Sequence, residues 1–432
     1  MIPTQVAKPA LHPELAPVVD AFATAGVRWL LLRTPDGGLS TPRGDIDLLV
    51  HPRDLALAAR LACRVGFAKA PRRGRDVHLL RYSVHTDQWL WLHITSSLHF
   101  GNEPLPLEGP HGCITRRQFD ELLPRAEPDT SFWLLLWHCL AEKAQVAPHH
   151  RPALRIGAVA ADCSGRFARA FARTVGSPVI TATLLDAIVH DNWSAVDAEI
   201  PACVTARNAA MSRNVTTRLA RGIARRGSAL MHWRERRGLS VALLGPDGAG
   251  KTTLATGICS SVPFPSRVIY MGLTGGALRY IRRTRVPGLV FVASACVIWA
   301  RYLRAWSHMV RGRLVVFDRY VYDAVAPPGY TPRFLERVGR RLSRHLCPSP
   351  DLVLLLDAPG AVMYARKGEH DPDTLERWRQ HFRSLQSRLS RLHCLDAAQA
   401  ATAVRVEAVE HIWQLYAQTW TQSSARSPRR TS

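Results

Sequence analysis

The most constraining stretch of the chain is 241–253, which reads Val-Ala-Leu-Leu-Gly-Pro-Asp-Gly-Ala-Gly-Lys-Thr-Thr. A short apolar run of strand length is followed directly by a glycine-rich turn and then by residues that can begin a helix. The spacing from Gly245 to Gly250, Lys251 and Thr252 is that of a phosphate-binding P-loop. Because the apolar strand immediately precedes the loop, this interpretation is favoured over an ordinary glycine-rich turn.

The residue types of this loop fit the chemistry of a nucleoside triphosphate. Glycines let the backbone N–H groups approach phosphate oxygens, and the following helix N-terminus favours negative charge. Lys251 can reach the β- and γ-phosphates, and the Thr252 hydroxyl can hold Mg²⁺. We therefore expect ATP and Mg²⁺ as cofactors. The residues expected to bind the nucleotide are Gly245, Asp247, Gly248, Ala249, Gly250, Lys251, Thr252 and Thr253.

The charge balance is strongly basic, with 57 Lys and Arg against 34 Asp and Glu and a formal charge of +23. The arginines are scattered along the chain, so we expect a general attraction to phosphates and no specific nucleic-acid partner. The nine cysteines form no CxxC pair, and no signal peptide opens the sequence. These features predict a cytoplasmic protein. A homodimer is compatible with the sequence.

The longest apolar run covers residues 286–300 and is short for a membrane span. It predicts a largely buried helix. Arginines follow it at 301, 304 and 311, so peripheral contact with a membrane surface is the alternative.

The 432 residues exceed one ordinary domain, and their patterning predicts four regions. Residues 1–130 mix helical and strand-like segments, including paired strands at 79–84 and 89–94. Residues 131–237 are helical and end in an arginine-rich linking helix. Residues 238–422 alternate short apolar strands with helices, which predicts an α/β fold with a parallel sheet covered on both faces. Residues 423–432 are expected to form a disordered tail.

Further along the C-terminal region, three segments add to the P-loop. The apolar strand at 313–317 ends in Asp318 and Arg319. An aspartate there can support the Mg²⁺ shell, and an arginine can clamp an anionic acceptor. Arg366 and Lys367 precede a Gly and a polar loop, which suggests a lid whose cation stabilises the transferring phosphoryl group. The loop after the strand at 392–396 could approach an adenine base.

Together these segments resemble the thymidylate kinase-like branch of the P-loop kinases. The matching motifs are Gly-Pro-Asp-Gly-Ala-Gly-Lys-Thr-Thr at 245–253, Asp-Arg-Tyr at 318–320, Leu-Asp-Ala-Pro at 356–359, Arg-Lys-Gly-Glu at 366–369 and Leu-Asp-Ala at 395–397. The resemblance implies catalytic roles for Lys251, Arg319, Arg366 and Asp318. Lys251 would contact the transferred phosphate, Arg319 would hold the acceptor and Arg366 would act from the lid. Thr252 and Asp318 would hold Mg²⁺.

The acceptor side departs from this pattern. Thymidylate kinases carry an Arg-Glu-Pro-Gly type segment after their second strand, whereas residues 270–276 here read Tyr-Met-Gly-Leu-Thr-Gly-Gly. A long insertion follows and resembles kinase-like proteins of bacterial surface-polysaccharide loci. A nucleoside monophosphate offers an ionised oxygen, whereas a sugar hydroxyl needs a base, for which Asp247, Asp318 and Asp323 are candidates.

Near the N-terminus, the segment Gly-Asp-Ile-Asp-Leu-Leu-Val at 44–50 places Asp45 and Asp47 on one side of a strand. Two such carboxylates could share Mg²⁺. The segment resembles nucleotidyltransferase-like domains of the polymerase-β type. Arg33-Thr34 replaces the small residues usual after the first strand, unless Gly37-Gly38 serves from further along. Trp91 stands where a third carboxylate is expected, and Asp87 could substitute only if the strand register differs. These departures favour a degenerate module that binds nucleotide or substrate.

The sequence thus predicts ATP-dependent phosphoryl transfer to a nucleoside monophosphate or a related small acceptor. Alternatives are a nucleotidyltransferase with a regulatory P-loop domain, a kinase of sugars or polysaccharide precursors, and a non-enzymatic nucleotide switch or nucleic-acid binder.

Overall fold

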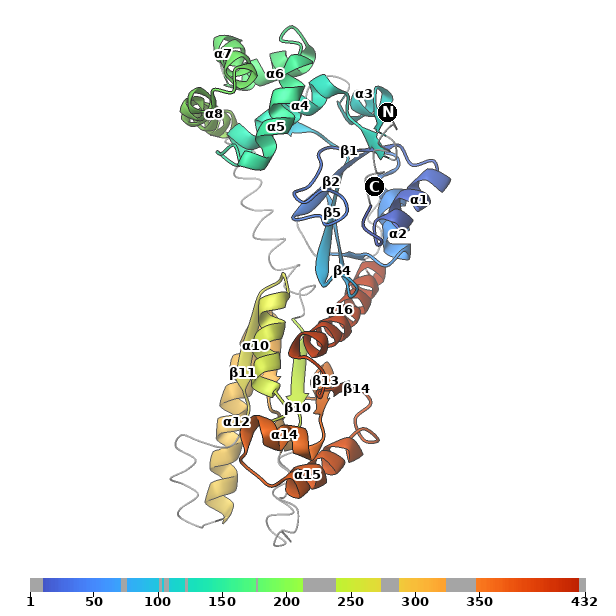
Figure 1. Cartoon of the computed structure of the whole chain (residues 1–432), viewed down its shortest axis with the longest axis vertical. Helices are drawn as coiled ribbons and strands as arrows, with labels where there is room; N and C mark the ends of the chain where they lie inside the picture. Colours follow the sequence, from blue (N-terminus) through green and yellow to red (C-terminus); the bar gives the residue numbers. More distant parts are fainter. Residues whose placement is uncertain are drawn as a thin grey trace, which may run out of the picture. The chain divides into compact units, whose positions relative to one another are not determined.

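In the computed structural model, the described residues are 11–70, 76–100, 103–104, 109–120, 123–175, 178–212, 238–272, 287–323 and 347–426. The chain divides into two compact units (Figure 1). The first comprises Met1–Ser83 and Gln88–Arg225, and the second comprises Val84–Asp87 and Arg226–Ser432. Each unit has its own sheet and is described by itself.

The first unit is built on a seven-stranded mixed sheet of order β3-β4-β5-β2-β1-β9-β8. Its strands are β1 (Trp29–Leu31), β2 (Asp45–Val50), β3 (Ala68–Lys69), β4 (Val77–Ser83), β5 (Gln88–Thr95), β8 (Gln118–Asp120) and β9 (Leu123–Arg125). A separate pair is formed by β6 (His99–Phe100) and β7 (Glu103–Pro104). The predicted pairing of β4 with β5 is confirmed and is antiparallel. Strands β2 and β5 are parallel, which sets Asp47 beside His93.

The same unit contains helices α1 (Ala16–Thr24), α2 (Leu55–Arg64) and α3 (Gly109–Thr115). The following segments are helical, as the apolar spacing predicts: α4 (Pro128–Trp137), a π-helical turn (His138–Glu142), a 3-10 turn (Pro148–His150), α5 (Arg151–Val159), α6 (Arg166–Val175), α7 (Pro178–Val189) and α8 (Trp193–Ser212). Their buried side chains share one hydrophobic core with Leu30 and Leu49 of the sheet. The helical region is therefore packed onto the strands. The expected linking helix, residues 213–237, lies outside the described residues.

The second unit contains a five-stranded parallel sheet of order β11-β12-β10-β13-β14. Its strands are β10 (Ser240–Leu244), β11 (Ser266–Tyr270), β12 (Leu314–Asp318), β13 (Leu352–Asp357) and β14 (Leu392–Asp396). Every residue of β10 and β12 is buried, as expected for a parallel sheet covered on both faces. The predicted α/β fold is confirmed. Because β10 is central, with chain crossovers to either side, the loop after it lies where ligands bind in such sheets.

The helices of this unit are α10 (Lys251–Ser261), α12 (Pro287–Val310), α14 (Gly360–Lys367), α15 (Pro372–Ser384) and α16 (Ala401–Arg426), with a 3-10 turn at Val321–Asp323. Side chains of α12 and α15 pack in one hydrophobic core with residues of β10, β12 and β13. Helices α10 and α16 pack against each other. Helix α16 continues through 423–426, so the prediction of disorder is wrong for those residues.

Helix α12 differs from its prediction in length and in burial. It runs ten residues beyond the apolar segment, to Val310. Val292 is 57% exposed, Leu303 54% and Trp306 51%, so the prediction of a largely buried helix is wrong for this face. None of the described helices is long and apolar enough to cross a membrane.

Candidate active site

The loop between β10 and α10 takes a backbone path that requires glycine. Gly245 has a φ of +144° and Gly248 a φ of +86°, a region that other residues rarely adopt. A Cβ at Gly245 would lie 2.8 Å from the Leu356 carbonyl oxygen, and one at Gly248 would lie 2.6 Å from the Met363 carbonyl oxygen. The loop is therefore pressed against β13 and α14, and its amides precede the N-terminus of α10, which suits a bound phosphate.

The Lys251 side chain curls back over this loop and is buried. Its Nζ donates hydrogen bonds to the carbonyl oxygens of Gly245, at 2.6 Å, and Pro246, at 2.7 Å. The ammonium group is thus kept beside the loop amides, where a phosphate chain would be bound.

Thr252 and Asp318 meet across two neighbouring strands. Leu243 near the end of β10 pairs with Asp318 at the end of β12, and Thr252 follows in the first turn of α10. The Thr252 Oγ1 donates to Asp318 Oδ2 at 2.7 Å. A hydroxyl and a carboxylate are both oxygen ligands of the type that Mg²⁺ prefers, so these residues fit the predicted metal.

Arg319 follows with a φ of +70°, an unusual conformation for an arginine. Its guanidinium forms an ion pair with Asp247 of the P-loop. Burial alone would raise the pKa of the Asp247 carboxyl, but Arg319 and Lys251 together hold that pKa below its usual value. Asp247 is therefore ionised and paired with cations, and Arg319 stands at the carboxyl end of the sheet beside the loop.

The two basic residues of the predicted lid lie in different surroundings. The Arg366 Nη1 donates to the Ala397 carbonyl oxygen at 2.8 Å. Lys367 forms a 3.0 Å ion pair with Glu369 and lies close enough to Asp247 to lower its pKa. Ligand atoms of Asp247, Glu369 and His370 lie within 4.8 Å of one another, so the loop after α14 reaches the P-loop.

A pocket of about 360 Å³ opens beside the start of α10. Gly250, Thr253 and Leu254 line one part of it, and Ala397 and Gln399 after β14 line another. Arg366 also lines it, together with residues at the start of α16. The volume falls within the range of small-molecule sites. The loop after β14 therefore lines this pocket, and its approach to a nucleotide base stays a prediction.

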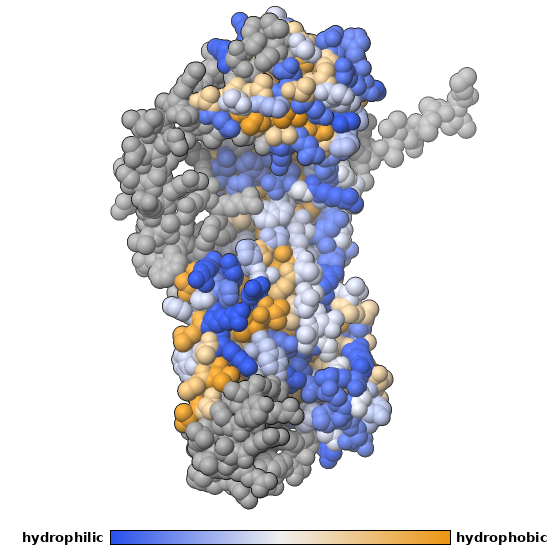
Figure 2. All heavy atoms as spheres, turned by 90° about the vertical axis from the view of Figure 1, so that its left-hand side faces the viewer, coloured by the Kyte–Doolittle hydropathy of each residue, from blue (hydrophilic) through white to orange (hydrophobic). Residues whose placement is uncertain are grey.

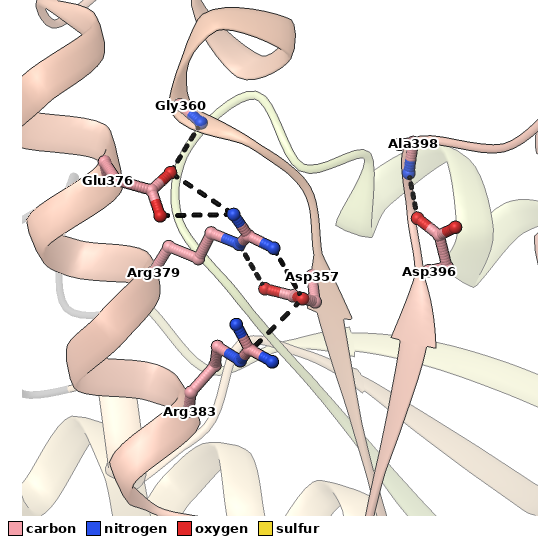
Figure 3. A network of polar contacts seen from close by, with 7 residues as sticks. All are labelled: Asp357, Gly360, Glu376, Arg379, Arg383, Asp396 and Ala398. Carbon is pink, nitrogen blue, oxygen red and sulfur yellow. Dashed lines mark hydrogen bonds and ion pairs between the residues drawn. The ribbon is translucent and has the colours of Figure 1, made fainter.

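A polar network joins α15 to the end of β13, as Figure 3 shows. Arg379 of α15 donates to both carboxylate oxygens of Asp357 at the end of β13, at 2.6 and 3.0 Å. Glu376 accepts from Arg379 and from the Gly360 amide at the start of α14. The network holds both helices that flank the lid loop. No local sequence pattern indicates it, because its members are spread over three elements.

In the first unit, Asp45 and Asp47 have different environments. Asp45 is exposed and Asp47 is buried. Asp47 contacts the His93 Nδ1 and the Arg33 Nη2, each at 2.7 Å. Burial raises the pKa of the Asp47 carboxyl, but His93 and Arg33 together lower it below its usual value. These two cations compete with a metal ion for the same oxygens.

A third metal ligand is not found beside these carboxylates within the described residues. Trp91 pairs in register with Asp45, at the position where a carboxylate is expected. Burial would lower the pKa of His93, but Asp47 and Asp76 on either side of the ring raise it to about 9. The nucleotidyltransferase-like interpretation of this unit, with Asp45 and Asp47 as metal ligands, stays a prediction.

The parallel sheet and the glycine loop after β10 define the second unit as a P-loop domain. A thymidylate kinase family model matches residues 285–409. The thymidylate kinase of Xanthomonas campestris pv. campestris (strain B100) is 29% identical over 184 residues, covering 39% of this chain and 79% of that protein. The thymidylate kinase of Xanthomonas euvesicatoria pv. vesicatoria (strain 85-10) is 28% identical, with 39% and 80% covered. These matches confirm the predicted thymidylate kinase-like domain.

Among solved structures, a thymidylate kinase from Candida albicans is 16% identical to this chain. The alignment covers 42% of this chain and 93% of that one, with a TM-score of 0.35.

Proposed function

We propose that the second unit transfers the terminal phosphoryl group of ATP, with Mg²⁺, to a nucleoside monophosphate. The contact between Thr252 and Asp318 carries the proposal, because it combines a P-loop hydroxyl with a carboxylate from the neighbouring strand. The family match at 285–409 supports a kinase of this type. The related proteins matched above are named thymidylate kinases, so thymidylate is the first acceptor to test.

The binding roles follow from the positions of the side chains. The loop amides and Lys251 hold the phosphate chain, while Thr252 and Asp318 hold Mg²⁺, which neutralises charge on the phosphates. The base of ATP occupies the pocket beside Gly250 and Thr253, against Arg366. Arg319 holds the acceptor, and Asp247 orients its guanidinium. Arg319 is not among the residues that line the pocket, so these roles separate the acceptor from the base of ATP.

The transfer forms one bond and breaks one bond. An ionised oxygen of the acceptor phosphate attacks the γ-phosphorus, and the bond from that phosphorus to the β–γ bridging oxygen breaks, which releases ADP. Lys251 and Lys367 lie where they can stabilise the charge on the moving group. The acceptor oxygen already carries a negative charge, so the step needs no general base.

The surroundings of Asp247 and Asp318 favour a phosphate acceptor over a sugar hydroxyl. Asp247 is ion-paired with Arg319, and the two nearby cations make it a weak base. Asp318 accepts the hydrogen bond from Thr252 and is assigned to the metal. Asp247 and Asp318 are therefore both engaged by other groups. The side chain of Asp323, the third candidate base, lies outside the described residues.

The test is ADP release from ATP across a panel of nucleoside monophosphates, nucleosides and sugars. ADP formation that requires a monophosphate and disappears in Lys251→Ala supports the proposal. A signal with sugars alone identifies a sugar kinase, and nucleotide binding without any acceptor-dependent ADP identifies a switch. Nucleoside triphosphate turnover that survives Lys251→Ala but fails in Asp45→Asn would instead locate catalysis in the first unit.

We further propose that the protein works in the cytoplasm, where ATP is available. Exposed cysteines such as Cys63 and Cys163 carry free thiols. Free thiols are usual in a reducing compartment.

A further inference from the structure

Helix α12 presents an exposed apolar row that the phosphotransferase site does not use. Val292, Trp299, Leu303 and Trp306 are 57%, 43%, 54% and 51% exposed. Their spacings of seven, four and three residues put them on one face of the helix. We call these four residues the α12 stripe. Cys296, also exposed, falls between them at the same spacing.

The opposite face of the same helix accounts for its attachment to the fold. Ser294, Ile298 and Ala305 are buried, and Ile298 and Ala305 belong to the core beneath the sheet. Tyr302 and Met309 pack against that core as well. Because this second face packs against the core, the α12 stripe is not used in the packing of the part of the domain that the structure describes. Such a contiguous exposed apolar row marks an interaction surface.

A cluster of arginines lies at the C-terminal end of α12. Arg304 and Arg311 are exposed and seven residues apart, so they follow one flank of the stripe. Arg313 contacts the His308 ring at 3.2 Å. Partial burial and then the charges of Arg313, Arg267, Arg311 and Arg304 lower the pKa of His308. Several positive charges are therefore concentrated beside the apolar stripe.

Charge decides which partner fits this face. Helix α12 contains no Asp or Glu, and the whole chain carries a formal charge of +23. A second copy would bring two acid-free, basic helices together and would leave their arginines unpaired. An anionic surface complements these arginines, and tryptophans are favoured at the boundary between lipid headgroups and acyl chains.

We propose that α12 docks this protein on an anionic lipid membrane, with the α12 stripe inserted among the headgroups and the arginine cluster against their phosphates. Figure 2 shows the molecule from the side on which α12 lies in Figure 1. On this face, apolar residues lie next to strongly hydrophilic ones. The helix lies in the plane of the interface, which agrees with its inability to span the membrane. The docking is a property of this surface and does not depend on the identity of the acceptor.

The experiment is co-sedimentation of the full chain with vesicles of phosphatidylcholine alone or mixed with phosphatidylglycerol. We expect binding to the anionic vesicles that weakens as salt rises. The double variant Leu303→Glu/Trp306→Glu removes the apolar contact. Its matched control is Ile156→Glu/Val159→Glu, which changes two residues of α5 that are 73% and 83% exposed. The stripe variant should lose binding by roughly tenfold or more, and the control should bind like the wild type.

A second pair of variants tests the charges. Arg304→Gln/Arg311→Gln should weaken binding roughly 30-fold, because the two arginines near an anionic surface together contribute about 2 kcal/mol. Arg60→Gln/Arg64→Gln on α2 removes the same charge from two other exposed positions and should change binding little. Unchanged thermal unfolding and ADP formation show that each variant is folded.

Three results would overturn the proposal. The wild-type chain could fail to sediment with anionic vesicles, or the stripe and arginine variants could bind as their controls do. Alternatively, sedimentation velocity could show that Leu303→Glu/Trp306→Glu converts a dimer to a monomer while vesicle binding is unchanged, which would assign the stripe to a second copy of the chain.

Discussion

The hydroxyl of Thr252 and the carboxylate of Asp318, 66 residues apart in the chain, are joined by a 2.7 Å hydrogen bond. Thr252 lies in the first turn of α10 and Asp318 ends β12, so the contact depends on the parallel pairing of β10 with β12. The pairing brings together two oxygen ligands beside the phosphate-binding loop. The proposed Mg²⁺ site therefore depends on the register between β10 and β12.

Asp318→Asn should lower kcat by roughly 10²- to 10³-fold, since a neutral amide is a poor Mg²⁺ ligand and stabilises less charge in the transition state. The Mg²⁺ concentration needed for half-maximal rate should rise. The measurement is ADP formation over a Mg²⁺ series. Asp373→Asn, an exposed carboxylate in the first turn of α15, is the control. An unchanged Mg²⁺ dependence in Asp318→Asn would remove Asp318 from the metal site.

Arg319→Ala should raise the KM for the monophosphate acceptor roughly 10- to 100-fold, the effect of losing charge-assisted hydrogen bonds. The KM for ATP should change little, because Arg319 does not line the pocket proposed for ATP. Arg319→Lys should restore only part of the affinity, since lysine lacks the planar pair of donors. Steady-state kinetics with each substrate varied in turn separates these effects. Equal increases in both KM values would contradict the assignment.

The sequence predicts the parallel sheet and the P-loop well, because both depend on local patterns. Apolar runs of strand length and the glycine spacing at 245–250 are sufficient to locate them. The arginine-aspartate pair at 318–319 is recognisable for the same reason. Each of these features is indicated by short continuous segments of sequence.

Contacts between distant segments could not be predicted in this way. Nothing in the sequence links Arg33 and His93 to Asp47, yet these partners neutralise the carboxylate assigned to Mg²⁺. The exposure of the α12 stripe was missed because an apolar run does not say which of its faces is buried. Arg366 and Lys367 are adjacent in sequence, but only the structure shows that they face different groups.

Arg366→Ala and Lys367→Ala should therefore have different effects. Loss of Arg366 removes one wall of the ATP pocket and should raise the KM for ATP roughly tenfold. Loss of Lys367 should lower kcat more than it raises either KM, because its charge acts near the P-loop. Each variant serves as the control for the other. The same kinetic defect in both would show that the lid acts as a single cationic unit.

Arg379→Ala should destabilise the second unit by about 2 kcal/mol, because it leaves the Asp357 carboxylate without its paired donors. The two side chains are 20% and 13% exposed, so solvent replaces the lost contacts only in part. Arg383→Ala is the matched control: its guanidinium lies 3.9 Å from the same carboxylate and is 55% exposed. Its loss should cost less than about 1 kcal/mol.

Urea unfolding followed by circular dichroism measures both changes in the free energy of unfolding. Equal losses for Arg379→Ala and Arg383→Ala would show that the bidentate geometry in Figure 3 contributes nothing beyond the nearby charge.

The pairing of His93 with Asp47 and Asp76 should make the stability of the first unit depend on pH. The pKa of His93 is raised from 6.5 to about 9 in the folded protein. The protonated ring therefore stabilises the fold fully below pH 6.5, and this contribution is lost as the pH rises through 9. The pKa of Asp47 is lowered, so its contribution has the opposite sign and is lost only in acid, below its usual value. The free energy of unfolding of this unit should thus fall between pH 6.5 and 9.

Chemical denaturation across that range, followed by tryptophan fluorescence, measures this slope. His93→Gln should flatten it and should reduce stability most at the acidic end of the window, because the uncharged amide cannot balance two carboxylates. His190→Gln changes an exposed histidine of the same unit and should leave the slope as it is. If His93→Gln retains the wild-type slope, the imidazolium is not the group that ties Asp47 to the sheet, and Arg33 alone balances that carboxylate.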